Sequence, residues 1–195
     1  MPDDSTAIRL MLILPAGFAP EAASALARAG DVAAVIARCG EAPEERARLT
    51  RLAGLLQQEG CAVVAEGRAD LAKPLGLDGA HLDGIGGLKA GLPALRPGLI
   101  AGVGGLTTRH DAMEAGEAGA DYVLFGGTGA PFEETLDGVS WWAELFEVPC
   151  VGVAGTLMEV VALAGSGADF IALTGDLLTP EGVAEAQARA AGAGA

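Results

Sequence analysis

Short runs of apolar residues alternate with longer stretches that mix apolar and polar positions, from one end of the chain to the other. Most of the runs are continuously apolar, which is typical of strands buried on both faces in a parallel sheet. They predict eight strands, at residues 8–14, 32–37, 61–65, 79–82, 99–103, 122–125, 150–153 and 170–173. The pattern therefore predicts an α/β fold in which each strand is followed by a helix.

One strand unit is repeated along the chain. The sequence GADYVLFGG at residues 119–127 returns as GADFIALTG at residues 167–175, and looser copies occupy residues 77–84 and 30–40. In the two closest copies, a glycine ends a helix, an aspartate begins a strand, and a glycine turn follows the strand. Repetition of a helix-to-strand unit indicates a repeated architecture. Asp121 and Asp169, at the amino ends of their strands, are predicted to be structural.

Helix signals lie between the predicted strands. Apolar positions keep one face of residues 43–59. Pro93 is expected to shorten the helix near residues 88–95, and Trp141 and Trp142 belong to a helix after the sixth strand, where at least one should pack on the barrel wall. Three helix starts are predicted from Thr108 with Asp111, Thr156 with Glu159, and Thr179 before Pro180.

Eight strand–helix units in 195 residues leave about 24 residues for each unit, which is compact for an eight-fold barrel. The alternative is a doubly wound open sheet, which would usually carry a glycine-rich phosphate fingerprint after its first strand. The sequence LILPAGFAP at that place lacks such a fingerprint. We therefore predict a compact (β/α)8 TIM barrel, with residues 1–195 forming a single domain.

Composition excludes several classes of partner. The formal net charge is −14, and no run of Lys or Arg offers a surface for nucleic acid. No signal peptide and no apolar run of about 20 residues is present, so we expect a cytoplasmic protein without a membrane partner. The three cysteines have no paired metal-ligand spacing and are interpreted as reduced thiols. The apolar helix around residues 141–146 is a candidate face for a homodimer.

In a barrel, the loops that follow the strands carry the function. His81, at the end of the fourth strand, is a candidate general base or ligand, or a hydrogen-bonded interior group. Glu66, Asp83 and Asp176 follow three different strands and are either oxygen ligands for Mg²⁺ or separate solvated acids. The loops at residues 154–156 and 174–176 either hold a phosphate on backbone amides or are simple tight turns.

Five segments carry a family resemblance in their order and spacing: VVAEGRADLAKPLGLDGAHLD, IAGV, EAGEAGADYVLFG, EVPCVGV and GSGADFIAL. From about residue 10 to residue 178, the chain resembles the thiamine-phosphate synthase and thiazole tautomerase (TenI) family. The resemblance implies a compact eight-fold barrel and a place in thiamine biosynthesis. The synthase reaction joins a hydroxymethylpyrimidine diphosphate to a thiazole phosphate and releases pyrophosphate, with Mg²⁺ on the leaving group. A small phosphorylated heterocyclic substrate is the implied partner.

Residue roles follow from the resemblance together with the strand positions. The predicted catalytic residues are Arg38, Arg68 and His81, and the predicted Mg²⁺ ligands are Glu66 and Asp83. Substrate and phosphate would be bound by Gly126, Thr128, Gly155, Thr156, Thr174 and Gly175. Some family features are replaced: a usual lysine is Gly40, and the loop after the sixth strand has Glu133 and Glu134 but no lysine or histidine.

Three functional hypotheses follow. The first is a divergent thiamine-phosphate synthase that uses the residues named above. The second is a barrel without catalysis that binds a small phosphorylated or heterocyclic metabolite, or a protein partner, and the replaced residues favour it. The third is a barrel enzyme of different chemistry, with Glu66, His81 and Asp83 as acid and base groups.

Overall fold

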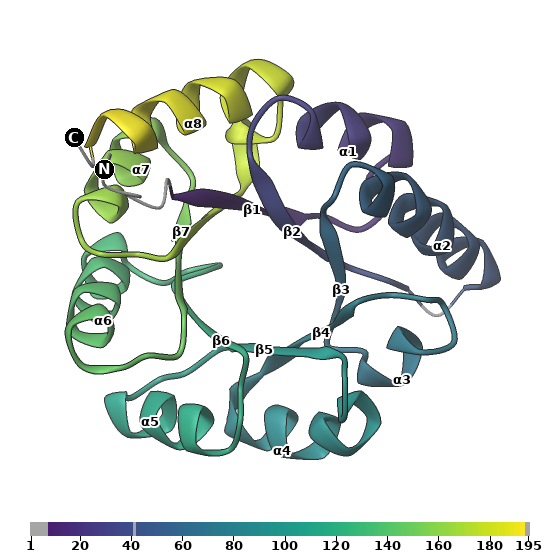
Figure 1. Cartoon of the computed structure of the whole chain (residues 1–195), viewed down its shortest axis with the longest axis horizontal. Helices are drawn as coiled ribbons and strands as arrows, with labels where there is room; N and C mark the ends of the chain where they lie inside the picture. Colours follow the sequence, from purple (N-terminus) through teal and green to yellow (C-terminus); the bar gives the residue numbers. More distant parts are fainter. Residues whose placement is uncertain (1–7, 41, 194–195) are drawn as a thin grey trace, which may run out of the picture.

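The computed structural model of the chain describes residues 8–40 and 42–193. In these ranges the strands pair in sequence order, all in parallel, and β1 pairs with β8 to close the barrel. The helices surround the ring of strands (Figure 1). The elements are β1 (Arg9–Leu14), α1 (Pro20–Ala27), β2 (Val32–Ala37), α2 (Pro43–Gln58), β3 (Ala62–Glu66), α3 (Ala69–Ala72), β4 (Gly79–Asp83), α4 (Gly84–Leu95), β5 (Ile100–Gly104), α5 (Arg109–Glu117), β6 (Tyr122–Phe125), α6 (Phe132–Leu145), β7 (Cys150–Ala154), α7 (Leu157–Ala164), β8 (Phe170–Leu173), the 3₁₀ helix η1 (Gly175–Leu177) and α8 (Pro180–Ala193).

The closed barrel confirms the predicted fold class, and the eight predicted strands match β1 to β8 with shifts of one residue at some ends. Side chains alternate across the barrel wall, so Leu10 and Leu12 face the helices while Met11 and Ile13 face the interior. The core between strands and helices is built mainly of Leu, Val and Ala. A smaller interior cluster consists of Met11, Ile36, Val64, Tyr122, Leu124, Val151, Val153 and Ala172.

Aspartates at the amino ends of every second strand tie that strand to the preceding one. The Oδ2 atom of Asp121 accepts a hydrogen bond of 2.7 Å from the amide of Ala101, and Asp169 accepts one of 2.8 Å from Cys150. Asp78 likewise accepts one of 2.7 Å from the amide of Val63, and Asp31 pairs with Arg9. The aspartates of the sequence repeat are therefore structural, as predicted. They lie at the end of the barrel opposite to the strand exits.

Helix capping follows the sequence closely. Thr108 with Asp111 and Thr156 with Glu159 both form complete capping boxes, and the Thr179 hydroxyl accepts from the amide of Gly182. The prediction for Pro93 was wrong. The helix α4 begins at Gly84 and runs to Leu95 with Pro93 inside its last turn. Proline there has no N–H for the carbonyl of Lys89, but the helical bonding resumes where the amide of Arg96 donates to the carbonyl of Leu92.

The aromatic end of α6 packs mostly inward. Trp142 is 1% exposed and its indole N–H donates to the carbonyl of Val148 at 2.7 Å, which confirms that one tryptophan packs on the barrel wall. Phe146 stacks on Trp142, and the exposed apolar side chain in this helix is Leu145. Self-association through this face stays a prediction. The three cysteines are free thiols, and none of the described helices is long and apolar enough to cross a membrane.

Candidate functional site

A pocket of about 420 Å³ opens at the carboxyl ends of the strands, where the barrel interior meets the loops. Ile13, Ile36, Leu124 and Val153 form its apolar floor, and glycine-rich loops form much of its wall. Among the described lining residues, Arg38 is the one cation, whereas Glu66, Asp83 and Glu159 contribute carboxylates. A second hollow of about 390 Å³ adjoins the pocket and shares Arg38 and Glu66 with it.

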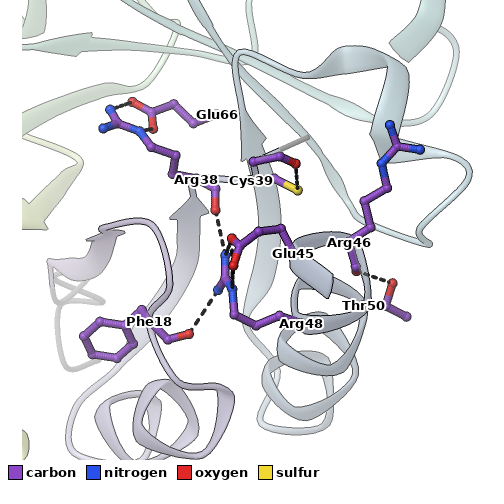
Figure 2. Close-up of polar contacts among 9 residues, drawn as sticks. Phe18, Arg38, Cys39, Glu45, Arg46, Arg48, Thr50 and Glu66 are labelled. Atoms are coloured by element: carbon purple, nitrogen blue, oxygen red, sulfur yellow. Dashed lines mark hydrogen bonds and ion pairs between the residues drawn. The ribbon is translucent and has the colours of Figure 1, made fainter. Parts of the chain in front are cut away.

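Arg38 and Glu66 face each other across the exits of β2 and β3. The guanidinium donates from Nε to Oε2 at 2.5 Å and from Nη2 to Oε1 at 2.8 Å, which is a bidentate ion pair (Figure 2). The hydrogen bond to Glu66 and its charge raise the pKa of Arg38. The Arg38 side chain is 61% exposed, and that of Glu66 is 31% exposed. Both carboxylate oxygens of Glu66 are thus engaged by Arg38 at the edge of the pocket.

A second arginine holds the backbone from which Arg38 extends. The Arg48 guanidinium donates to the carbonyl of Arg38 at 2.9 Å, to the carbonyl of Phe18 at 3.0 Å and to the carboxylate of Glu45 (Figure 2). Its side chain is 14% exposed. The hydrogen bonds from Arg48 also lower the pKa of Glu45. Arg48, on α2, therefore joins the loops that follow β1 and β2.

His81 comes from β4 and points into the barrel. Its Nδ1 atom lies 2.9 Å from the hydroxyl of Tyr122, and the two rings stack with centroids 5.7 Å apart. Burial lowers the pKa of His81 to about 4, because the interior disfavours the charged imidazolium more than the carboxylates of Glu66 and Asp83 favour it. His81 is neutral at physiological pH. This matches the hydrogen-bonded interior group considered from the sequence.

The comparisons with known proteins agree on one family. The sequence profile of the thiamine monophosphate synthase family matches residues 10–177. The chain belongs to this family. It is 38% identical over 199 residues to a thiamine-phosphate synthase of Rhodospirillum centenum, covering 94% of this chain and 96% of the relative. A second thiamine-phosphate synthase, from Erythrobacter litoralis, is 37% identical over 155 residues and covers 74% and 73%.

A solved structure shows the same fold. The thiamine phosphate pyrophosphorylase of Pyrococcus furiosus superposes with a TM-score of 0.79 at 20% sequence identity, and the match covers 98% of this chain and 99% of that one. The resemblance of the five sequence segments to the thiamine-phosphate synthase family is therefore confirmed at the level of family and fold.

Most of the predicted site residues meet in the pocket. Its lining includes eight of them: Arg38, Glu66, His81, Asp83, Gly126, Thr128, Gly155 and Thr174. Gly175 lines the adjoining hollow. The other two turn to structural partners that the structure shows: Arg68 pairs with Asp70 through two hydrogen bonds, and the Thr156 hydroxyl caps α7. Their roles in catalysis or phosphate binding stay predictions.

The family implies Mg²⁺, which in proteins is commonly held by one or two carboxylates together with substrate phosphates. The described residues contain no group of three or more metal-ligating side chains. Gly105, which follows β5, leaves space for the Asp83 carboxylate of β4. A Cβ atom on Gly105 would lie 2.1 Å from Oδ1 of Asp83. The exposed Asp83 carboxylate fits an ion that arrives with a diphosphate, whereas Glu66 would first have to leave Arg38.

The amides predicted to hold phosphate have partners within the protein. The carboxylate of Glu159 accepts from the amide of Gly155 at 2.7 Å and from that of Thr156 at 3.1 Å. The amide of Thr174 donates to the carbonyl of Ala154. The amides of Gly155, Thr156 and Thr174 are therefore engaged, and an anion at the start of α7 would meet the negative charge of Glu159.

Sequence reasoning missed two residues that shape the site. Glu159 was identified only as a helix cap, although a cap that follows β7 must lie beside the mouth of the barrel. Tyr122 was assigned to a strand without a role. Its signal was available, because it is the chain's single tyrosine and lies on an inward-facing position of a strand near the predicted position of His81.

Proposed function

We propose that this protein is a thiamine-phosphate synthase that joins a pyrimidine diphosphate to a thiazole phosphate. The observation that supports the proposal is the pocket itself, where Arg38, His81 and Asp83 meet around one space of about 420 Å³ at the strand exits. Family membership supplies the reaction. A cytoplasmic site of action is part of the same proposal.

The reaction breaks the bond between the pyrimidine methylene carbon and the diphosphate oxygen, and forms a bond between that carbon and the thiazole nitrogen. Electrons of the broken bond leave with pyrophosphate. The methylene carbon becomes electron-poor, and the carboxylates of Asp83, Glu66 and Glu159 favour positive charge in the pocket. Arg38 would hold the departing diphosphate. Mg²⁺ held by Asp83 and the diphosphate would neutralise the leaving group.

Pyrophosphate release tests this function directly. The purified protein is given both substrates and Mg²⁺, and pyrophosphate is measured against a reaction without protein. We expect turnover, and a loss of about a hundredfold in Arg38→Met and Asp83→Asn, because each removes one charged partner of the transition state. Arg51→Met is the matched control, since Arg51 is an exposed residue of α2 that pairs with Glu21 of α1. No pyrophosphate above the blank would reject the proposal.

A second candidate function, binding without turnover, is favoured by one observation. The groups predicted to bind substrate phosphates already have partners within the protein: Arg38 pairs with Glu66, and the amide of Gly155 donates to Glu159. Calorimetry with thiazole phosphate, with and without Mg²⁺ and pyrophosphate, separates the two functions. Micromolar binding together with no pyrophosphate release would establish the binding protein, whereas turnover would exclude it.

A further inference from the structure

Three neighbouring strands place His81, Gly102 and Tyr122 in one layer of the barrel. His81 on β4 pairs with Gly102 on β5, and Gly102 pairs with Tyr122 on β6. A Cβ atom on Gly102 would lie 1.9 Å from Cζ of Tyr122. The missing side chain on β5 therefore allows the tyrosine ring to cross that strand. Its hydroxyl reaches Nδ1 of His81, 2.9 Å away.

The direction of this hydrogen bond follows from what surrounds the hydroxyl. Burial raises the pKa of Tyr122 far above its ordinary value, so the phenol keeps its proton. Among the described residues, His81 is the partner of this hydroxyl. If Nδ1 donated to the phenol oxygen, the buried phenol proton would have no acceptor within the described protein, which is costly. The hydroxyl therefore donates to Nδ1, and the neutral imidazole carries its hydrogen on Nε2.

The Nε2 atom lies on the pocket side of the ring. A Cβ atom on Gly104 would lie 2.9 Å from it, so the glycine at the end of β5 leaves it uncovered. His81 lines the pocket, and Nδ1 is the ring nitrogen that has a protein partner. We propose that Tyr122 is a positioning residue that fixes the Nε2–H tautomer of His81, so that His81 donates a hydrogen bond to an acceptor atom of a bound heterocycle.

This proposal gives His81 a role different from a general base. A neutral histidine whose Nδ1 is occupied and whose Nε2 carries hydrogen offers the ligand a donor and no acceptor. The matching chemistry on the ligand is an unprotonated ring nitrogen or a carbonyl oxygen. The part that concerns the ligand rests on the proposed function, whereas the tautomer is a property of the protein alone.

The tautomer can be read from ¹H–¹⁵N correlation spectra of the histidine rings in the untagged, ligand-free protein at pH 7. The chain has two histidines, and His110→Asn leaves His81 as the sole source of signal. We expect a protonated Nε2 and an unprotonated Nδ1. In Tyr122→Phe, which keeps the ring over Gly102, we expect the nitrogen signals to move toward an average of both tautomers. A protonated Nδ1 in the wild type, or unchanged signals in Tyr122→Phe, would overturn the positioning role.

Ligand binding tests the donor role. Calorimetry with thiazole phosphate and with a pyrimidine diphosphate should show about a 3- to 10-fold loss of affinity for one of them in Tyr122→Phe. In a His81→Phe background the same substitution should cause no further loss, because the tyrosine acts through the histidine. Additive losses would indicate a merely structural tyrosine. If the spectra show the expected tautomer but the protein has no turnover, only the proposed function is rejected, because the spectra need no substrate.

Discussion

Arg38 and Glu66 form a bidentate ion pair across the mouth of the barrel, with N–O distances of 2.5 and 2.8 Å. The pair joins the predicted diphosphate-binding cation to one of the predicted metal ligands. Each group therefore limits what the other can bind. A diphosphate that approaches Arg38 must compete with a carboxylate that already satisfies the guanidinium geometry.

The first prediction concerns this competition. Glu66→Gln keeps the size of the side chain and removes its charge, so Arg38 becomes available to an anion. We expect inorganic pyrophosphate to bind about fivefold more tightly in the absence of Mg²⁺, which corresponds to about 1 kcal/mol for one charge at the surface. Calorimetry measures the affinity. Arg38→Met should abolish the gain in the double variant, and weaker pyrophosphate binding in Glu66→Gln would contradict the prediction.

Arg48 is expected to matter for stability as well as for the site. Arg48→Met leaves a carboxylate and two backbone carbonyls without their donor. Because the arginine is largely buried, we expect the free energy of unfolding to fall by about 2–4 kcal/mol. Denaturant unfolding measures this change.

Arg51, on the same helix, provides the matched comparison for Arg48. Its side chain is 69% exposed and pairs with Glu21. Arg51→Met should change the free energy of unfolding by less than about 0.5 kcal/mol. Equal effects of the two substitutions would show that Arg48 does not fasten the loops.

The barrel could be predicted from the sequence because its signals are local. Continuous apolar runs mark strands buried on both faces, and a threonine three residues before an acid marks a helix start; both reappear in the structure. Pro93 misled the prediction, because α4 continues past it to Leu95 although proline has no N–H to bond the carbonyl four residues earlier.

The connections within the site could not be predicted in the same way. Arg38 and Glu66 are 28 residues apart and His81 and Tyr122 are 41 residues apart, so each pair depends on strand register. The meeting of His81 with Tyr122 also requires a glycine on the strand between them. A sequence shows these residues separately, whereas their pairing depends on the closed barrel.

Stability should fall as the pH falls from about 6.5 to about 4, in part through His81. The pKa of His81 is about 4 in the folded protein, below the ordinary value of 6.5. Between these pH values the unfolded chain binds a proton that the folded protein does not, so acid favours unfolding by up to about 3 kcal/mol. Urea unfolding between pH 5 and pH 6.5 measures the slope. His81→Phe should show a smaller slope, and an unchanged slope would contradict the assigned pKa.

Gly102 should tolerate no side chain. Gly102→Ala places a methyl group inside the Tyr122 ring, and we expect a loss of at least about 1–3 kcal/mol in the free energy of unfolding. Gly54, within α2, has open space around its Cβ position and is exposed. Gly54→Ala should stabilise the protein by about 0.5–1 kcal/mol. Thermal and urea unfolding measure the stability of both variants. A Gly102→Ala variant as stable as the wild type would contradict the prediction.

Glu159 is expected to weaken phosphate binding at the start of α7, since its carboxylate accepts from the amides of Gly155 and Thr156. Glu159→Gln keeps an oxygen acceptor and removes the negative charge that an incoming phosphate would meet. The affinity for thiazole phosphate should rise about fivefold, whereas that for the uncharged thiazole alcohol should stay unchanged. Calorimetry with both ligands measures this difference.

Asp111 supplies the control for Glu159, because it forms the same capping box with Thr108 at the start of α5 and does not line the pocket. Asp111→Asn and Glu159→Gln should both lower the free energy of unfolding slightly, since both remove a negative charge from a helix N-terminus. Only Glu159→Gln should alter phosphate affinity. A gain in both variants would point to the overall charge of −14 as the cause, and a gain in neither would mean that the phosphate binds elsewhere in the mouth of the barrel.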